Sequence, residues 1–159
     1  MATASLQDAI RAARSEDFLR ALNLFLEIYG AAESLPMRTP NDASGLSYFG
    51  LCLALVRRQF KPAIDLCRRA IELEFYNGDH YANLSRVYSA AGNRKKAVEA
   101  ADEGLRLHPE DEYLTNVRNA LGIRATPAVP FLDRANPINV TLGQSRHAKK
   151  IAEDEKKKK

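Results

Sequence analysis

The sequence predicts an all-α fold in which the helices pair into three successive hairpins. Apolar residues recur at helical spacing through most of the first 122 residues, and no segment shows the sustained alternation that is typical of a strand. Small residues also return at a fixed interval, because Ala63 and Ala97 are 34 residues apart, as are Ala70 and Gly104. Such equal spacing indicates that similar helix pairs approach one another closely and repeat along the chain.

The first hairpin is predicted close to the N-terminus. Ser5 and Asp8 form a capping pair for a helix that continues to about Arg14. Ser15 is expected to cap the second helix, which runs through Ile28. The next stretch, LPMRTPNDASG, contains two prolines and several turn residues, so we expect a loop there.

The second hairpin follows this loop. Its first helix is expected over about 46–57 and its second over about 61–74. Pro62 then occupies a first-turn position, where no intrahelical partner for an amide is needed.

The third hairpin and a final helix complete the pattern. Asp79 is predicted to cap the fifth helix, and Gly92 is predicted to end it in the left-handed conformation. Asn93 then caps the sixth helix. A seventh helix is expected over about 111–121, with Gly122 as its end.

The third hairpin carries a recognisable series of large, small, aromatic, glycine and proline positions: Tyr81, Leu84, Ser85, Tyr88, Gly92, Ala97, Ala101, Gly104 and Pro109. This series resembles the tetratricopeptide repeat (TPR) family, whose unit is a helix pair of about 34 residues. The second hairpin matches with Gly50, Ala54, Phe60, Ala63 and Ala70. It has Arg58 in place of the turn glycine, and the first hairpin, with Ala9, Ala12, Phe18 and Ala21, also lacks that glycine.

The resemblance implies an α-α superhelix of three TPR hairpins, a capping helix and a proline-containing tail. We expect a TPR domain over 1–124 and a tail over 125–159. Within the domain, the units are expected at about 4–35, 44–77 and 78–111, with the capping helix at 111–122. The segment PFLDRANPINVTLGQSRH in the tail is similar to tails of small bacterial proteins of this repeat class, which favours a bacterial source and implies no known activity.

The resemblance also implies a concave groove, lined by the first helix of each pair, that binds an extended peptide or a helix of another protein. The groove-facing positions are the helical neighbours of the packing positions. They are Tyr48, Cys52, Leu55, Asp79, Asn83, Arg86, Ser89, Tyr113 and Asn116, with Leu6 and Ile10 in the first unit. Tyr48 and Arg86 are of the residue types most common in binding hot spots. For Leu6, Ile10 and Leu55 we favour the alternative that they complete the core.

One subclass of the family grips the C-terminal carboxylate of chaperone tails through basic residues and asparagines. Asn83 fits one of those places. The other places hold Tyr48, Cys52, Tyr113 and Val117, which cannot bind a carboxylate as Lys, Arg or Asn would. The sequence therefore disfavours a chaperone-tail adaptor.

No residue pattern indicates catalysis, a metal site or a cofactor. His80, His108 and His147 have no partner at nucleophile or metal spacing, and no glycine-rich phosphate loop is present. Cys52 and Cys67 are interpreted as small, reduced core residues. We therefore expect a non-catalytic adaptor or scaffold that binds a protein. A type III-like secretion chaperone and a self-assembling scaffold or homo-oligomer remain alternatives, although such chaperones tend to be acidic.

Charge and hydropathy bear on the partner and the location. The net charge is +4, and the last fifteen residues, with seven Lys/Arg and three Asp/Glu, account for all of it. The neutral body therefore disfavours nucleic acid as a partner. The longest apolar run, over 48–56, is too short for the roughly 20 residues that cross a bilayer. No signal peptide is evident, so we expect a cytoplasmic protein.

The tail combines prolines with apolar residues between Val129 and Leu142. Two interpretations have similar weight: part of this segment packs back on the repeats, or it is an extended arm that awaits a partner. The terminal lysines could bind phosphates or an acidic protein surface, although a terminal charge run is most often solvated.

Overall fold

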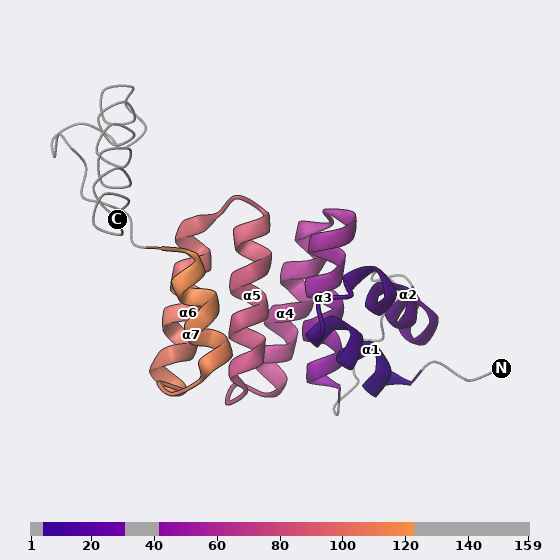
Figure 1. The fold of residues 1–159 in the computed structure, drawn as a ribbon, viewed down its shortest axis with the longest axis horizontal. Coiled ribbons are helices and arrows are strands. Elements are labelled where there is room, and N and C mark those ends of the chain that lie inside the picture. Colours follow the sequence, from indigo (N-terminus) through magenta and orange to yellow (C-terminus); the bar gives the residue numbers. More distant parts are fainter. Residues whose placement is uncertain (1–4, 31–41, 123–159) are drawn as a thin grey trace, which may run out of the picture. The chain divides into compact units, whose positions relative to one another are not determined.

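The computed structural model describes residues 5–30 and 42–122, which belong to one compact unit (Figure 1). Within these ranges the regular structure is entirely α-helical, as predicted. The helices are α1 (Leu6–Arg14), α2 (Phe18–Tyr29), α3 (Ala43–Arg57), α4 (Phe60–Leu73), α5 (Gly78–Ala90), α6 (Arg94–Leu107) and α7 (Glu112–Ala120). Most of the predicted proline loop and the whole tail over 125–159 lie outside the described residues.

The two turns within the first hairpins use residues other than glycine in the left-handed region. Glu16 has a φ of 63° and Arg58 a φ of 58°, while Gly92 has a φ of 77° in the third hairpin. Arg58 and Gly92 are 34 residues apart, and Glu16 precedes Arg58 by 42, which is one period plus eight residues. The three hairpins therefore share one turn geometry, which glycine adopts at least cost.

Several predicted helix starts are wrong in detail. Ser5 is the N-cap residue of α1, as predicted, but its side chain makes no capping hydrogen bond. Ser15 ends α1, and Asp17 caps α2 by accepting from the Arg20 backbone N–H at 3.3 Å. This shift arises because the left-handed Glu16 must lie between the two helices before α2 can begin.

The starts of α3 and α5 also differ from the prediction. Helix α3 begins three residues early, because Ala43 packs into a buried cluster with Leu46 and Ala70 rather than remaining in the loop. Asn77, and not Asp79, caps α5, since its Oδ1 accepts from the Asp79 backbone N–H at 3.1 Å.

The predicted cap of α6 is confirmed, and α7 has a cap that was not predicted. Asn93 accepts from the Lys96 backbone N–H at 3.1 Å and so caps α6. Asp111 caps α7 by accepting from the Leu114 backbone N–H at 2.8 Å. Gly122 follows α7 with a φ of 67°, as expected for a left-handed terminator.

The small residues at the 34-residue interval lie where helices pack closely. Ala63 and Ala97 are both fully buried. At Gly104, a Cβ atom would lie 2.7 Å from the Cβ of Tyr81 and 2.6 Å from Cδ2 of Leu114. At Gly50, it would lie 2.8 Å from the backbone oxygen of Ala63. Close approach within the second and third hairpins thus requires residues without a larger side chain.

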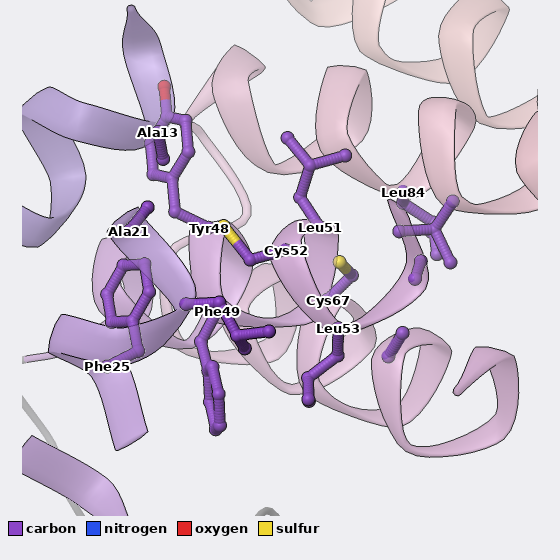
Figure 2. Packing of buried hydrophobic residues seen from close by; sticks show 14 of the residues in the cluster. Ala13, Ala21, Phe25, Tyr48, Phe49, Leu51, Cys52, Leu53, Cys67 and Leu84 are labelled. Atoms are coloured by element: carbon purple, nitrogen blue, oxygen red, sulfur yellow. The ribbon is translucent and has the colours of Figure 1, made fainter. Parts of the chain in front are cut away.

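Helix α3 is the centre of the core. It packs against α1, α2, α4 and α5, and every residue from Gly45 to Ala54 is buried. Phe25 of α2 and Phe49 of α3 lie with ring centroids 5.6 Å apart, and Figure 2 shows them beside each other. The apolar run in the sequence is therefore helical and is covered on all sides from Tyr48 to Ala54, whereas Val56 at its end is exposed.

The packing order repeats along the unit. The first helices contact in series, as α1 with α3, α3 with α5, and α5 with α7. The second helix of each pair also contacts the next first helix, as α2 with α3, α4 with α5, and α6 with α7. Together these contacts form a helical-repeat superhelix. Across the part of the chain that is described, no helix has the length and apolar character that a membrane crossing requires.

Candidate functional site

Two adjoining hollows lie along the first helices of the pairs. The larger, of about 580 Å³, is lined by Glu16, Leu55, Ser85, Arg86, Ser89, Ala90, Tyr113, Asn116, Val117, Ala120 and Leu121. The smaller, of about 250 Å³, is lined by Ala13, Arg14, Glu16, Tyr48, Asp79, Arg86 and Tyr113. They share three residues, Glu16, Arg86 and Tyr113. We refer to the two hollows together as the inner groove.

A compact polar cluster forms the wall of the smaller hollow. The Tyr48 hydroxyl donates to Oδ2 of Asp79 at 2.6 Å, and Arg14 donates to the same oxygen at 2.9 Å. Arg14 Nε also donates to the Tyr48 hydroxyl at 3.0 Å. Burial, reinforced by the Asp79 carboxylate, raises the pKa of Tyr48, so this phenol remains a donor at neutral pH. The cluster therefore joins α1, α3 and α5 at one end of the inner groove.

Arg86 lies between the two hollows. Its Nη1 donates to the Tyr113 hydroxyl at 3.1 Å, and its Nη2 donates to Oε1 of Glu16 at 3.1 Å. The guanidinium also lies over the Phe18 ring, 5.2 Å from the centroid. The Arg86 side chain is 23% exposed and that of Glu16 is 69% exposed. This bridge connects α5 with the turn between α1 and α2.

A buried polar chain runs beneath the inner groove. The Tyr113 hydroxyl donates to Oδ1 of Asn83 at 3.0 Å, and Nδ2 of Asn83 donates to the Ser47 hydroxyl at 3.0 Å. Asn83 and Ser47 are fully buried. Because a buried amide without partners is costly, these bonds hold α3, α5 and α7 in one register.

The structure brings most of the predicted groove residues together. Seven of them line the two hollows: Tyr48, Leu55, Asp79, Arg86, Ser89, Tyr113 and Asn116. Cys52 and Asn83 do not, because both are fully buried between neighbouring helices, so their placement on the groove surface is corrected. The main core contains Ile10, and Leu6 and Leu55 pack against it. This agrees with the alternative that these three residues complete the core.

Sequence reasoning missed two charged residues of the inner groove, Arg14 and Glu16. A signal for Arg14 is present, since Leu6, Ile10 and Arg14 follow one another at intervals of four along one helix face. Glu16 carries no such signal, because it is in a turn and reaches Arg86 from 70 residues away. Two ion pairs in the inner groove, Arg14 with Asp79 and Glu16 with Arg86, thus depend on tertiary structure.

The two cysteines lie in the interior. Burial raises the pKa of Cys52 to about 12, and burial also raises the pKa of Cys67. The two cysteines are free thiols, and Figure 2 shows both in the core around α3.

Over residues 5–30 and 42–122, there is no group of three or more His, Cys, Asp or Glu side chains that could hold a metal ion. The inner groove offers donors, acceptors and apolar surface, which suits it to binding.

Comparison with known structures shows the class of fold. The TPR domain of Arabidopsis OM64 is similar with a TM-score of 0.54 and 16% sequence identity, over 72% of this chain and 88% of that chain. The first TPR of Spaghetti (RPAP3), bound to the HSP90 peptide SRMEEVD, is similar with a TM-score of 0.52 and 14% identity, over 72% of this chain and 85% of that chain. No protein-family model and no curated protein sequence matches the chain. The chain thus has the fold of a TPR domain.

Proposed function

We propose that this chain is a non-catalytic protein-interaction module that binds a peptide or a helix of a partner protein in its inner groove. It would act as an adaptor or scaffold, because the inner groove supplies a surface on which a partner can bind. One observation carries this proposal: the larger hollow combines apolar walls from Leu55, Val117 and Leu121 with exposed polar groups on Ser89 and Asn116. Such a mixture is what specific binding sites use, since apolar contacts supply affinity and polar contacts supply orientation.

The similar TPR structure that holds a peptide supports the proposal. Its ligand is not proposed for this chain. Asn83, which fits one place of the chaperone-tail clamp, is fully buried and bonded to Ser47 and Tyr113, so it has no free amide for a partner's carboxylate.

Peptide selection tests the proposal directly. A random peptide library displayed on phage is selected against the full chain, and the enriched peptides are then synthesised. Asn116→Trp fills the larger hollow with a bulky neutral side chain and is expected to abolish binding. Asn119→Trp makes the same change at another exposed position of α7, outside the lining of that hollow, and is expected to leave binding unchanged.

The outcome is decisive in either direction. Peptides that lose binding with Asn116→Trp and keep it with Asn119→Trp support a groove-binding module. A failure to enrich any peptide, or equal effects of the two variants, contradicts the proposal. Circular dichroism of both variants shows whether the fold is retained.

A further inference from the structure

Glu16 places a carboxylate inside the inner groove. It lies in the left-handed turn after α1, and its Oε1 accepts from Nη2 of Arg86 at 3.1 Å. Because both hollows have Glu16 and Arg86 in their lining, the ion pair lies where the two hollows meet. The chain's own Glu16 thus pairs with Arg86 in the way that an acidic group of a bound ligand would.

The surroundings of Arg86 favour an anion when Glu16 moves away. In the larger hollow, Glu16 and Arg86 are the charged lining residues, and the others are neutral or apolar. In the smaller hollow, Asp79 is already bonded to the Tyr48 hydroxyl and to Arg14. Without Glu16, Arg86 would therefore present a guanidinium with one hydrogen bond to the Tyr113 hydroxyl and no carboxylate partner among the residues that line the larger hollow.

Displacement of Glu16 requires little free energy. Its side chain is 69% exposed, so the carboxylate regains water when it leaves Arg86. Arg86 is held from two other directions, by the Tyr113 hydroxyl and by the Phe18 ring, and therefore keeps its position. A bound peptide would also exclude water from the guanidinium, which strengthens a carboxylate contact relative to the exposed pair that it replaces.

We propose that the partner peptide presents an Asp or Glu side chain that displaces Glu16 from Arg86, with an apolar neighbour in the larger hollow. Glu16 then acts as an internal competitor that lowers the affinity for acidic ligands. This inference rests on the proposed function, because it names the chemistry of the ligand for the same inner groove. The group proposed to contact Arg86 is an acidic side chain within the peptide.

The test uses the peptides selected from the random library and versions in which each acidic residue is replaced by its amide. Affinities are measured by fluorescence anisotropy for the full chain and three variants. Glu16→Gln keeps the length of the side chain but removes the competing charge. Glu27→Gln, at an exposed position of α2 in the same hairpin, makes the same change in net charge and serves as the matched control. Arg86→Gln removes the guanidinium.

The expected results are specific. Replacement of the key acidic residue of the peptide by its amide weakens binding by at least about tenfold, and Arg86→Gln does the same for the acidic peptide. Glu16→Gln tightens binding of the acidic peptide by about two- to fivefold, the range that corresponds to loss of an exposed ion pair. Glu27→Gln leaves affinity unchanged, and the amide peptide does not distinguish Glu16→Gln from the original chain.

Failure of this inference differs from failure of the proposed function. If peptides bind with the required sensitivity to Asn116→Trp, but their amide versions bind equally well or Glu16→Gln has no effect, the role of Glu16 and Arg86 is wrong and the binding module stands. If no peptide binds in the inner groove, both are wrong.

Discussion

Asn83 donates a hydrogen bond to Ser47 across 36 residues of sequence, and both side chains are fully buried. Asn83 also accepts from the Tyr113 hydroxyl, so one amide connects α3, α5 and α7. This contact joins the last two hairpins and the final helix through a single interior residue. Its removal should therefore affect the whole unit.

We expect Asn83→Ala to lower the free energy of unfolding by about 2–4 kcal/mol, because it leaves the Ser47 and Tyr113 hydroxyls without their partner and opens a small cavity. Urea denaturation followed by circular dichroism measures the change. Ser89→Ala, at an exposed position of the same helix, should change stability by less than about 0.5 kcal/mol. An equally small effect of Asn83→Ala would show that this polar chain does not support the packing of the repeats.

Gly104→Ala tests the close approach of helices at a repeat position. The added methyl group would lie 2.7 Å from the Cβ of Tyr81, which cannot move without its backbone. Overpacking typically costs about 1–3 kcal/mol, against which alanine gains about 1 kcal/mol of helix propensity. We expect net destabilisation, seen as a lower Tm. Glu103→Ala, one residue earlier and exposed, is the control; a higher Tm for Gly104→Ala than for Glu103→Ala would refute tight packing here.

The left-handed turns predict opposite effects for two reciprocal changes. Arg58→Gly should stabilise the fold by about 0.5–1 kcal/mol, since it relieves the strain of a side chain at a φ of 58°. Gly92→Ala should destabilise it by about 1–2 kcal/mol at a φ of 77°. No atom lies within 4 Å of the added Cβ at Gly92, so only the backbone conformation contributes. Thermal unfolding of both variants checks the pair, and changes of the same sign would contradict the shared turn geometry.

Because His80 is buried, we expect the fold to lose stability on mild acidification. Its side chain is fully buried, with Nε2 3.3 Å from Oε2 of Glu74, and burial lowers its pKa despite the opposing effect of Glu74 and Asp79. Since the folded pKa lies below the unfolded value of about 6.5, protonation favours the unfolded chain. The stabilising contribution is complete above about pH 6.5 and is lost as the pH falls toward the folded pKa.

Urea denaturation over the range from about pH 7.5 to 5.5 tests this sign. The original chain should lose more stability over that range than His80→Gln, which has no imidazole to protonate. Carboxylates that titrate at lower pH affect both chains equally, so the difference between the two isolates His80. A steeper pH dependence in His80→Gln would show that the sign is wrong.

The two cysteines should be inert in the folded chain. Cys52 and Cys67 are fully buried, and burial raises the pKa of both thiols, to about 12 for Cys52. The thiolate is the reactive form, so a thiol reagent at neutral pH should react only as the chain unfolds. Ellman's reagent should detect both cysteines promptly in denaturant and neither at a comparable rate without it. Rapid reaction under native conditions would place at least one thiol at the surface.

The amino-acid pattern alone was sufficient for the repeat architecture. Helix pairs, the interval between Ala63 and Ala97, and the cap at Asn93 depend on residues close in sequence or on a fixed period. Such features follow from local conformational preference and from the side-chain size that close packing permits. The same periodicity also predicted that Tyr48, Arg86 and most of their neighbours share one side of the chain.

Tertiary structure decided which polar residues remain accessible and which pairs form in the inner groove. Cys52 and Asn83 have the helical spacing of groove residues, yet adjacent helices cover them, because α3 and α5 are each packed between neighbours. Arg14 and Glu16 enter the inner groove only because stacking of the hairpins brings the first turn to α5, 65 and 70 residues further along the chain. Helical periodicity determines the side of a helix on which a residue lies, whereas burial and ion pairing depend on which other helices reach that side.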